Sequence, residues 1–100
     1  MTEPNKLRLL PWSGPDGKPC YLSTDNRDGY MSRLADNIEA VQLGSAAQLL
    51  QASSATLNDR DVDPEELRRL AKELARALTD VLRVATSRGQ LLAANEPHGI

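Results

Sequence analysis

The side chains that most often carry out chemistry are few in this chain and stand far apart along it. Cys20 is the only cysteine and His98 the only histidine, and neither belongs to a cluster of ionisable residues. A metal centre or a nucleophilic active site needs several such groups converging on one point. Cys20 is therefore expected to be an inert, partly buried thiol, and His98 to lie in a flexible tail. We predict no catalytic residue, no bound metal and no cofactor.

Acidic residues occur in two arrangements that resemble known functional patterns. Asp59, Asp61 and Asp63 alternate as in a calcium loop, but the central glycine and the distal glutamate of such a loop are missing. Asp36 and Glu39 lie one turn apart on a predicted helix, as a pair of catalytic carboxylates would. No second segment clearly offers them a partner, so both are expected to face solvent. An enzyme with carboxylates at the centre of a helical bundle is therefore the weaker alternative.

Basic residues recur along one side of the predicted second helix. Arg68, Lys72 and Arg76 form a basic stripe that suits an acidic protein partner or a nucleic acid. Spacing of four residues predicts ion pairs that neutralise the stripe. These pairs are Glu65 with Arg69, Arg69 with Glu73, and Arg76 with Asp80. Because the net charge of the chain is −2, general attraction to nucleic acid is not expected.

Two of the three aromatic residues are candidates for recognition. Trp12 and Tyr21 lie on either side of a predicted tight turn, where a large side chain is well placed to contact a partner. Alternatively, Trp12 closes the end of a core made of leucine and alanine, which the composition favours. The candidate partner-binding residues are Trp12, Tyr21, Arg68, Lys72 and Arg76.

Three elements must position these side chains. Residues 7–22 contain two short apolar runs around Gly14-Pro15-Asp16-Gly17, which predicts a β-hairpin with a positive φ at Gly17. Residues 30–57 and 63–88 have apolar residues at helical spacing, which predicts two long helices. Asp63 is the expected N-cap of the second helix and Gly89 its expected end, and 90–100 is expected to be a flexible tail.

Two apolar lines are predicted on the first helix. The first line, which we call the predicted stripe of this helix, consists of Met31, Leu34, Ile38, Val41, Ser45, Leu49 and Ala52. The second line consists of Leu43, Ala46, Leu50 and Leu57. Two apolar lines on one helix imply two different neighbours.

The expected fold is a single, mainly α domain in which the N-terminal β-hairpin is followed by an antiparallel pair of long helices. One hundred residues without phenylalanine give a thin core, and one partner helix cannot cover the apolar arcs. We therefore expect a homodimer in which two copies form a four-helix bundle. The candidate interface residues are Leu43, Leu50, Leu57, Leu70, Leu74 and Val81.

No stretch of the sequence approaches the roughly 20 apolar residues that span a bilayer, and the N-terminus lacks the pattern of a signal peptide. We therefore expect a soluble cytoplasmic protein without a membrane partner.

Several short segments of the sequence resemble those of a protein family. These segments are LPW at 10–12, GKPCYL at 17–22, GYMSRLAD at 29–36, EAVQL at 39–43 and LRVA at 82–85. Over about residues 9–89 they look like those of small uncharacterised actinobacterial proteins, which tend to be found beside helix-turn-helix regulators and ATP-binding proteins. What the resemblance implies is a regulatory association, and it transfers no functional residue.

The functional expectation is a non-enzymatic regulatory protein that acts as a homodimer through contacts with an unidentified protein partner. The alternative is a nucleic-acid-associated regulator that uses the basic stripe, although a nucleic-acid partner is less expected.

Overall fold

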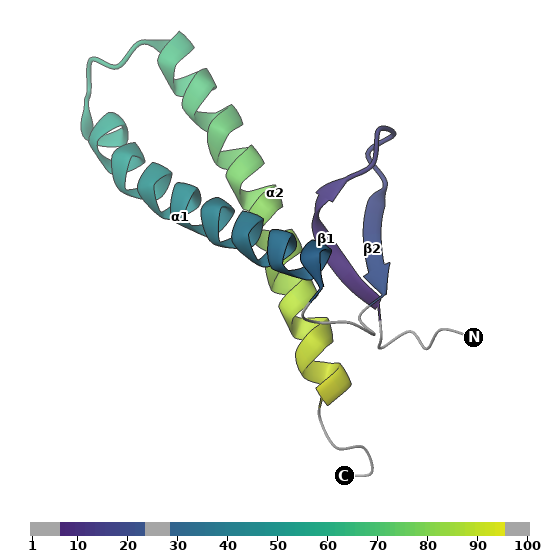
Figure 1. The fold of residues 1–100 in the computed structure, drawn as a ribbon. Coiled ribbons are helices and arrows are strands. Elements are labelled where there is room, and N and C mark those ends of the chain that lie inside the picture. The colour runs from purple at the N-terminus through teal and green to yellow at the C-terminus, as the bar shows by residue number, and fades with distance from the viewer. Residues whose placement is uncertain (1–6, 24–28, 96–100) are drawn as a thin grey trace.

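The chain folds into a two-stranded hairpin followed by two long helices. The structure, a computed structural model, describes residues 7–23 and 29–95 (Figure 1). The elements in chain order are β1 (Leu7–Ser13), β2 (Pro19–Ser23), α1 (Tyr30–Asn58) and α2 (Pro64–Asn95). The predicted fold class, an N-terminal β-hairpin before a pair of long helices, is confirmed.

The hairpin is antiparallel and has the predicted turn. The Gly14 and Lys18 backbones are joined by a 2.9 Å hydrogen bond, and Gly17 has a φ of 80°, which glycine adopts without strain. The paired residues are Leu7 with Ser23, Arg8 with Leu22, Leu9 with Tyr21, and Ser13 with Pro19. The register shifts between Leu9 and Ser13, so β1 is irregular where Pro11 cannot donate a backbone hydrogen bond.

The second helix begins as predicted but ends later. The Asp63 side chain accepts a 3.2 Å hydrogen bond from the Glu65 amide, as an N-cap should. At the other end α2 continues through Gly89 to Asn95. A glycine stop requires a positive φ, and Gly17 is the glycine with a positive φ in the described part of the chain. The prediction that Gly89 ends the helix is therefore wrong, and the rest of the predicted tail, 96–100 with His98, lies outside the described residues.

The face of α1 that turns inward differs in part from the predicted stripe. A row of buried and half-buried positions recurs every three or four residues: Ser32, Ala35, Glu39, Gln42, Ala46, Leu49, Ser53 and Thr56. Of the predicted stripe, Leu34, Ile38 and Leu49 are half-buried, whereas Met31, Val41, Ser45 and Ala52 are exposed. Most side chains of the row are small, which lets neighbouring backbones approach closely. The larger apolar side chains of α1 are left on its flanks.

The hydrophobic core lies at one end of the molecule. The hairpin sits beside the helix pair near the start of α1 and the second half of α2, while the loop that joins the helices is at the opposite end (Figure 1). The buried apolar side chains are Leu9, Leu10 and Pro11 of β1, Ala35 of α1 and Val84 of α2. The halves of the helices near the joining loop therefore extend beyond the hairpin and rely on each other for burial.

The molecule is extended for its size. The radius of gyration is 17.4 Å, whereas a compact chain of this length has a value of about 13 Å. The two helices extend well beyond the hairpin, which gives the molecule its elongated shape (Figure 1).

Gly44 gives a first prediction about α1. It lies in the middle of the helix, and a Cβ atom added there would meet nothing within 4 Å. Gly44→Ala is expected to raise the free energy of unfolding by about 1 kcal/mol, because alanine has the higher helix propensity. Urea denaturation followed by circular dichroism at fixed protein concentration measures this change.

The matched control is Gly17→Ala in the hairpin turn. A Cβ atom added to Gly17 also meets nothing within 4 Å, but its φ of 80° disfavours alanine, so this variant should lose stability. A loss of stability in Gly44→Ala would contradict the expectation and would mean that another chain packs closely on this side of α1.

Candidate functional site

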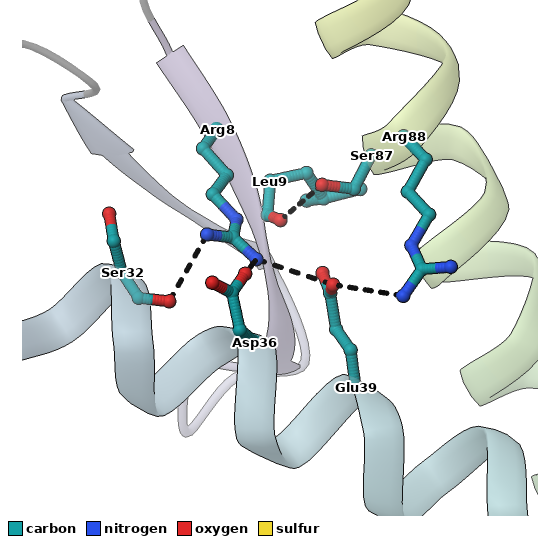
Figure 2. Close-up of polar contacts among 7 residues, drawn as sticks. All are labelled: Arg8, Leu9, Ser32, Asp36, Glu39, Ser87 and Arg88. Carbon is teal, nitrogen blue, oxygen red and sulfur yellow. Dashed lines mark hydrogen bonds and ion pairs between the residues drawn. The ribbon is translucent and has the colours of Figure 1, made fainter. Parts of the chain in front are cut away.

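A buried arginine joins the hairpin to the first helix. Arg8 of β1 has a side chain only 8% exposed. Its Nη1 atom donates to the Ser32 carbonyl oxygen at 3.2 Å, and its Nη2 atom donates to Asp36 Oδ1 at 2.6 Å (Figure 2). The same Nη2 atom lies 3.2 Å from Glu39 Oε1. Three groups of α1 therefore bind one guanidinium, which fixes where the strand meets the helix.

Glu39 extends this cluster to the second helix. Its side chain is 4% exposed, and its Oε1 atom lies 3.8 Å from an Nη2 atom of Arg88 on α2 (Figure 2). The expectation that Asp36 and Glu39 both face solvent is wrong for Glu39, whose buried charge is compensated by Arg8 and Arg88. Asp36 keeps an exposed side chain while binding Arg8. We call Arg8, Asp36, Glu39 and Arg88 the ion-pair cluster.

Side chains of both helices also bind the backbone of β1. Ser87 Oγ donates to the Leu9 carbonyl oxygen at 2.9 Å. The Pro11 carbonyl oxygen accepts from Gln42 Nε2 at 2.9 Å and from Arg83 Nη1 at 3.1 Å. These bonds give the Leu9 and Pro11 carbonyl groups donors from α1 and α2, so they attach β1 to both helices. In the ion-pair cluster, the two guanidinium groups of Arg8 and Arg88 pair with the two carboxylates of Asp36 and Glu39. The cluster and these hydrogen bonds therefore have a structural role: they hold the hairpin and the two helices together.

One side of the helix pair carries large apolar side chains, most of them exposed. We define the apolar face as Leu43, Leu50 and Leu57 of α1 together with Leu67, Leu78 and Leu82 of α2; Leu43 is half-buried and the other five are exposed. Exposure reaches 66% at Leu50, 62% at Leu57 and 58% at both Leu78 and Leu82. Monomeric soluble proteins rarely expose large apolar side chains in contiguous patches, and such patches usually mark interaction sites.

Helix geometry places these residues on one side of the helix pair. At 100° per residue, the α1 leucines are rotated by about 40–80° from the inward face of their helix. The α2 leucines are rotated in the same sense by about 90–150°, with Leu82 the furthest round. Because α1 and α2 run antiparallel, rotation in the same sense brings both rows to the same side. The six leucines therefore form one surface that extends across both helices.

A groove lies on the opposite flank of the helix pair. It consists of two adjoining hollows of about 330 and 160 Å³, which share Leu49 and Glu73 in their linings. Half-buried Ala46, Leu49 and Ala77 form an apolar floor, and exposed Val41 lines the α1 wall. We refer to this hollow region as the groove.

The basic stripe lies beside the groove and is not neutralised as predicted. No ion pair joins Glu65 to Arg69, Arg69 to Glu73, or Arg76 to Asp80 in the described part of α2. Instead, Asp80 lies 3.8 Å from Arg83, three residues further along the helix. Surface pairs at such spacings contribute only a few tenths of a kcal/mol, so long side chains readily take other positions. The charges of Arg68, Arg69, Lys72 and Arg76 are therefore available to a partner.

The structure does not gather the predicted partner-binding residues at one place. Tyr21 of β2 is 51% exposed, and Trp12 of β1 is half-buried. Arg68, Lys72 and Arg76 are exposed on the half of α2 that lies away from the hairpin (Figure 1). The hairpin and the basic stripe are therefore two separate surfaces.

The predicted interface residues fall into two groups. Leu43, Leu50 and Leu57 belong to the apolar face. By contrast, Leu70, Leu74 and Val81 are half-buried on the side of α2 that faces α1. Among the α2 leucines whose burial is described, Leu67, Leu78 and Leu82 are exposed. None of these three is a predicted interface residue, although all three belong to the apolar side of the predicted helix.

Within 7–23 and 29–95, no three His, Cys, Asp or Glu side chains are grouped so as to hold a metal ion. Neither α1 nor the described part of α2 combines the length and the apolar character of a membrane-crossing helix.

Comparison with known proteins gives no assignment: no family model, no curated protein and no solved structure matches the chain.

Proposed function

We propose that this chain is a non-enzymatic regulatory protein that acts through protein–protein contacts as a homodimer, with the apolar face as the surface between the two copies. The observation that carries the proposal is the exposure of Leu50, Leu57, Leu78 and Leu82 on one side of the helix pair. Two such sides packed together give the four helices of a bundle, in which each leucine row finds the apolar neighbours that its own chain does not supply.

The length of the apolar face suits a second copy as its occupant. Its leucines run from Leu43 to Leu57 on α1 and from Leu67 to Leu82 on α2, and each span is about 22 Å long at 1.5 Å per residue. Stable interfaces bury roughly 800 Å² on each partner, and obligate homodimers bury more. Burying these leucines against a second copy would remove apolar surface from water, which stabilises a dimer by about 25 cal/mol per Å².

Sedimentation velocity over a range of concentrations tests the proposal. From about 1 μM to about 500 μM, spanning the dissociation constants of typical dimers, we expect one species with twice the 10.9 kDa mass of the chain. A species that remains at 10.9 kDa across this range would contradict the proposal.

A further inference from the structure

The groove is long enough to hold several turns of a helix. Its lining on α1 runs from Val41 to Thr56, and on α2 from Asp80 back to Glu66. These segments of 15 or so residues extend about 22 Å at 1.5 Å per residue. A helix placed along two antiparallel helices would contact both walls over this length, which is the usual geometry of helix-in-groove recognition.

The two walls of the groove differ in charge. The α1 wall belongs to the segment 40–58, which contains no charged residue. The lining of the α2 wall contains the acidic residues Glu66, Glu73 and Asp80 and the basic residues Arg69 and Arg76. Arg68 and Lys72 lie next to these arginines around the helix. A partner helix would therefore meet a neutral surface on one flank and a charged one on the other.

The charges of the α2 wall are arranged in rows. Glu66 and Glu73 lie seven residues apart, and so do Arg69 and Arg76. At 100° per residue, the arginine row is rotated about 60° further from the inward face of α2 than the glutamate row is. The outer edge of this wall, where the flank of a bound helix would rest, is therefore basic. These arginines have no ion pair within the described part of the chain, so an acidic flank would complement them.

We propose that the groove binds an amphipathic helix of another protein, with apolar side chains on the floor of the groove and acidic side chains along the flank next to α2. This inference rests on the proposed role as an interaction protein and names the class of partner. It does not use the apolar face, so one chain can hold a second copy on one side and a partner helix on the other.

Two synthetic peptides of about 18 residues, long enough to fill the groove, serve as probes. Both carry the same leucine stripe, and they differ in having glutamate or lysine on the flanks. Binding to the full chain is measured by fluorescence anisotropy of a labelled peptide. We expect the glutamate peptide to bind at least about 10-fold more tightly than the lysine peptide, with a preference that weakens as salt is added.

Three variants locate the binding site. Arg69→Glu/Arg76→Glu should reverse the preference between the peptides. Val41→Asp should weaken binding of both peptides about 10-fold or more, because it places a charge in the apolar part of the groove. Leu50→Asp, on the apolar face, should leave peptide binding unchanged even if it alters self-association. The site and the dimer are thereby tested separately.

Several outcomes would overturn the inference. One is the absence of binding by the glutamate peptide. Another is binding that Leu50→Asp abolishes and Val41→Asp does not, since the peptide would then occupy the apolar face. A third is an equal affinity for the two peptides. A DNA duplex of mixed sequence that binds through Arg69 and Arg76 while neither peptide binds would also overturn it, in favour of a nucleic-acid partner.

Discussion

Replacing Arg8 with methionine is expected to lower the free energy of unfolding by about 3–5 kcal/mol, the usual effect of removing one partner from a buried ion pair. The side chain of Glu39 is 4% exposed, and its Oε2 atom already lacks a hydrogen-bond partner within the described residues. Without Arg8, the remaining ion-pair partner of Glu39 there is Arg88 at 3.8 Å. The buried carboxylate would then be poorly compensated, and the hairpin would lose its strongest link to α1.

Two spectroscopic probes distinguish loss of the hairpin from loss of the whole fold. Trp12 is the only tryptophan and lies in β1, so its fluorescence reports on docking of the hairpin. Circular dichroism reports on the helices, which make up most of the described residues. In urea denaturation of Arg8→Met at fixed protein concentration, we expect the fluorescence transition to move to lower urea than the helical transition. Coincident transitions at wild-type positions would contradict the expectation.

A double variant separates the ion pair from simple packing. In Arg8→Met/Glu39→Met both buried charges are removed, while Asp36 and Arg88 are exposed enough to be solvated. Replacing both members of a buried pair by apolar residues is often neutral or stabilising. The double variant should therefore recover most of the stability that the single variant loses. If it is as unstable as Arg8→Met, the loss comes from the volume of the arginine side chain and not from its charge.

The elements themselves could be predicted because their signals are local. The turn around Gly17 and the N-cap at Asp63 depend on residues within a few positions of each other, and the structure has both. The end of α2 could not be placed in the same way. Gly89 permits a helix stop but does not require one, and the residues that follow it are good helix formers. A glycine that merely allows a helix to end, such as Gly89, therefore predicts the end of the helix less reliably than a glycine in a tight turn, such as Gly17, predicts that turn.

The inward face of α1 could be predicted only in part, because it depends on the hairpin. Hydrophobic periodicity assumes that the largest apolar side chains face the nearest neighbour. Here the neighbour includes a strand that carries Arg8, so Ser32 and Glu39 turn inward while Val41 and Leu50 remain exposed. Arg8 lies within an apolar run, and nothing adjacent in sequence marks it as the partner of residues 24 to 31 positions away.

The surfaces proposed for function were predictable in part. Leu50 and Leu57 were identified as interface candidates from their helical spacing, and they are among the most exposed leucines. The corresponding row of α2, Leu78 and Leu82, was missed because a broad apolar arc does not reveal which part of it the neighbouring helix covers. The groove depends on the positions of two helices relative to each other, which no single segment of the sequence determines.

The second large effect is expected at the apolar face. Leu50→Asp and Leu82→Asp, one on each helix, should each raise the dissociation constant of the proposed dimer about 30-fold or more, which corresponds to the 2 kcal/mol typical of interface hot spots. The reason is that each change places a charge where the second copy would bury a leucine. Both leucines are more than half exposed in the single chain, so its helical content should be unchanged. Sedimentation equilibrium measures the constants, and circular dichroism checks the fold.

Val41→Asp is the matched control for Leu50→Asp. Val41 and Leu50 are both on α1 and both 66% exposed, but Val41 lines the groove on the other flank. A general effect of adding a charge to an exposed apolar position of α1 would weaken the dimer equally in both variants. An effect confined to Leu50 and Leu82 would assign self-association to the side of the helix pair where the six leucines lie. If Val41→Asp dissociates the dimer and Leu50→Asp does not, the two copies meet through the groove, and the apolar face must be covered in another way.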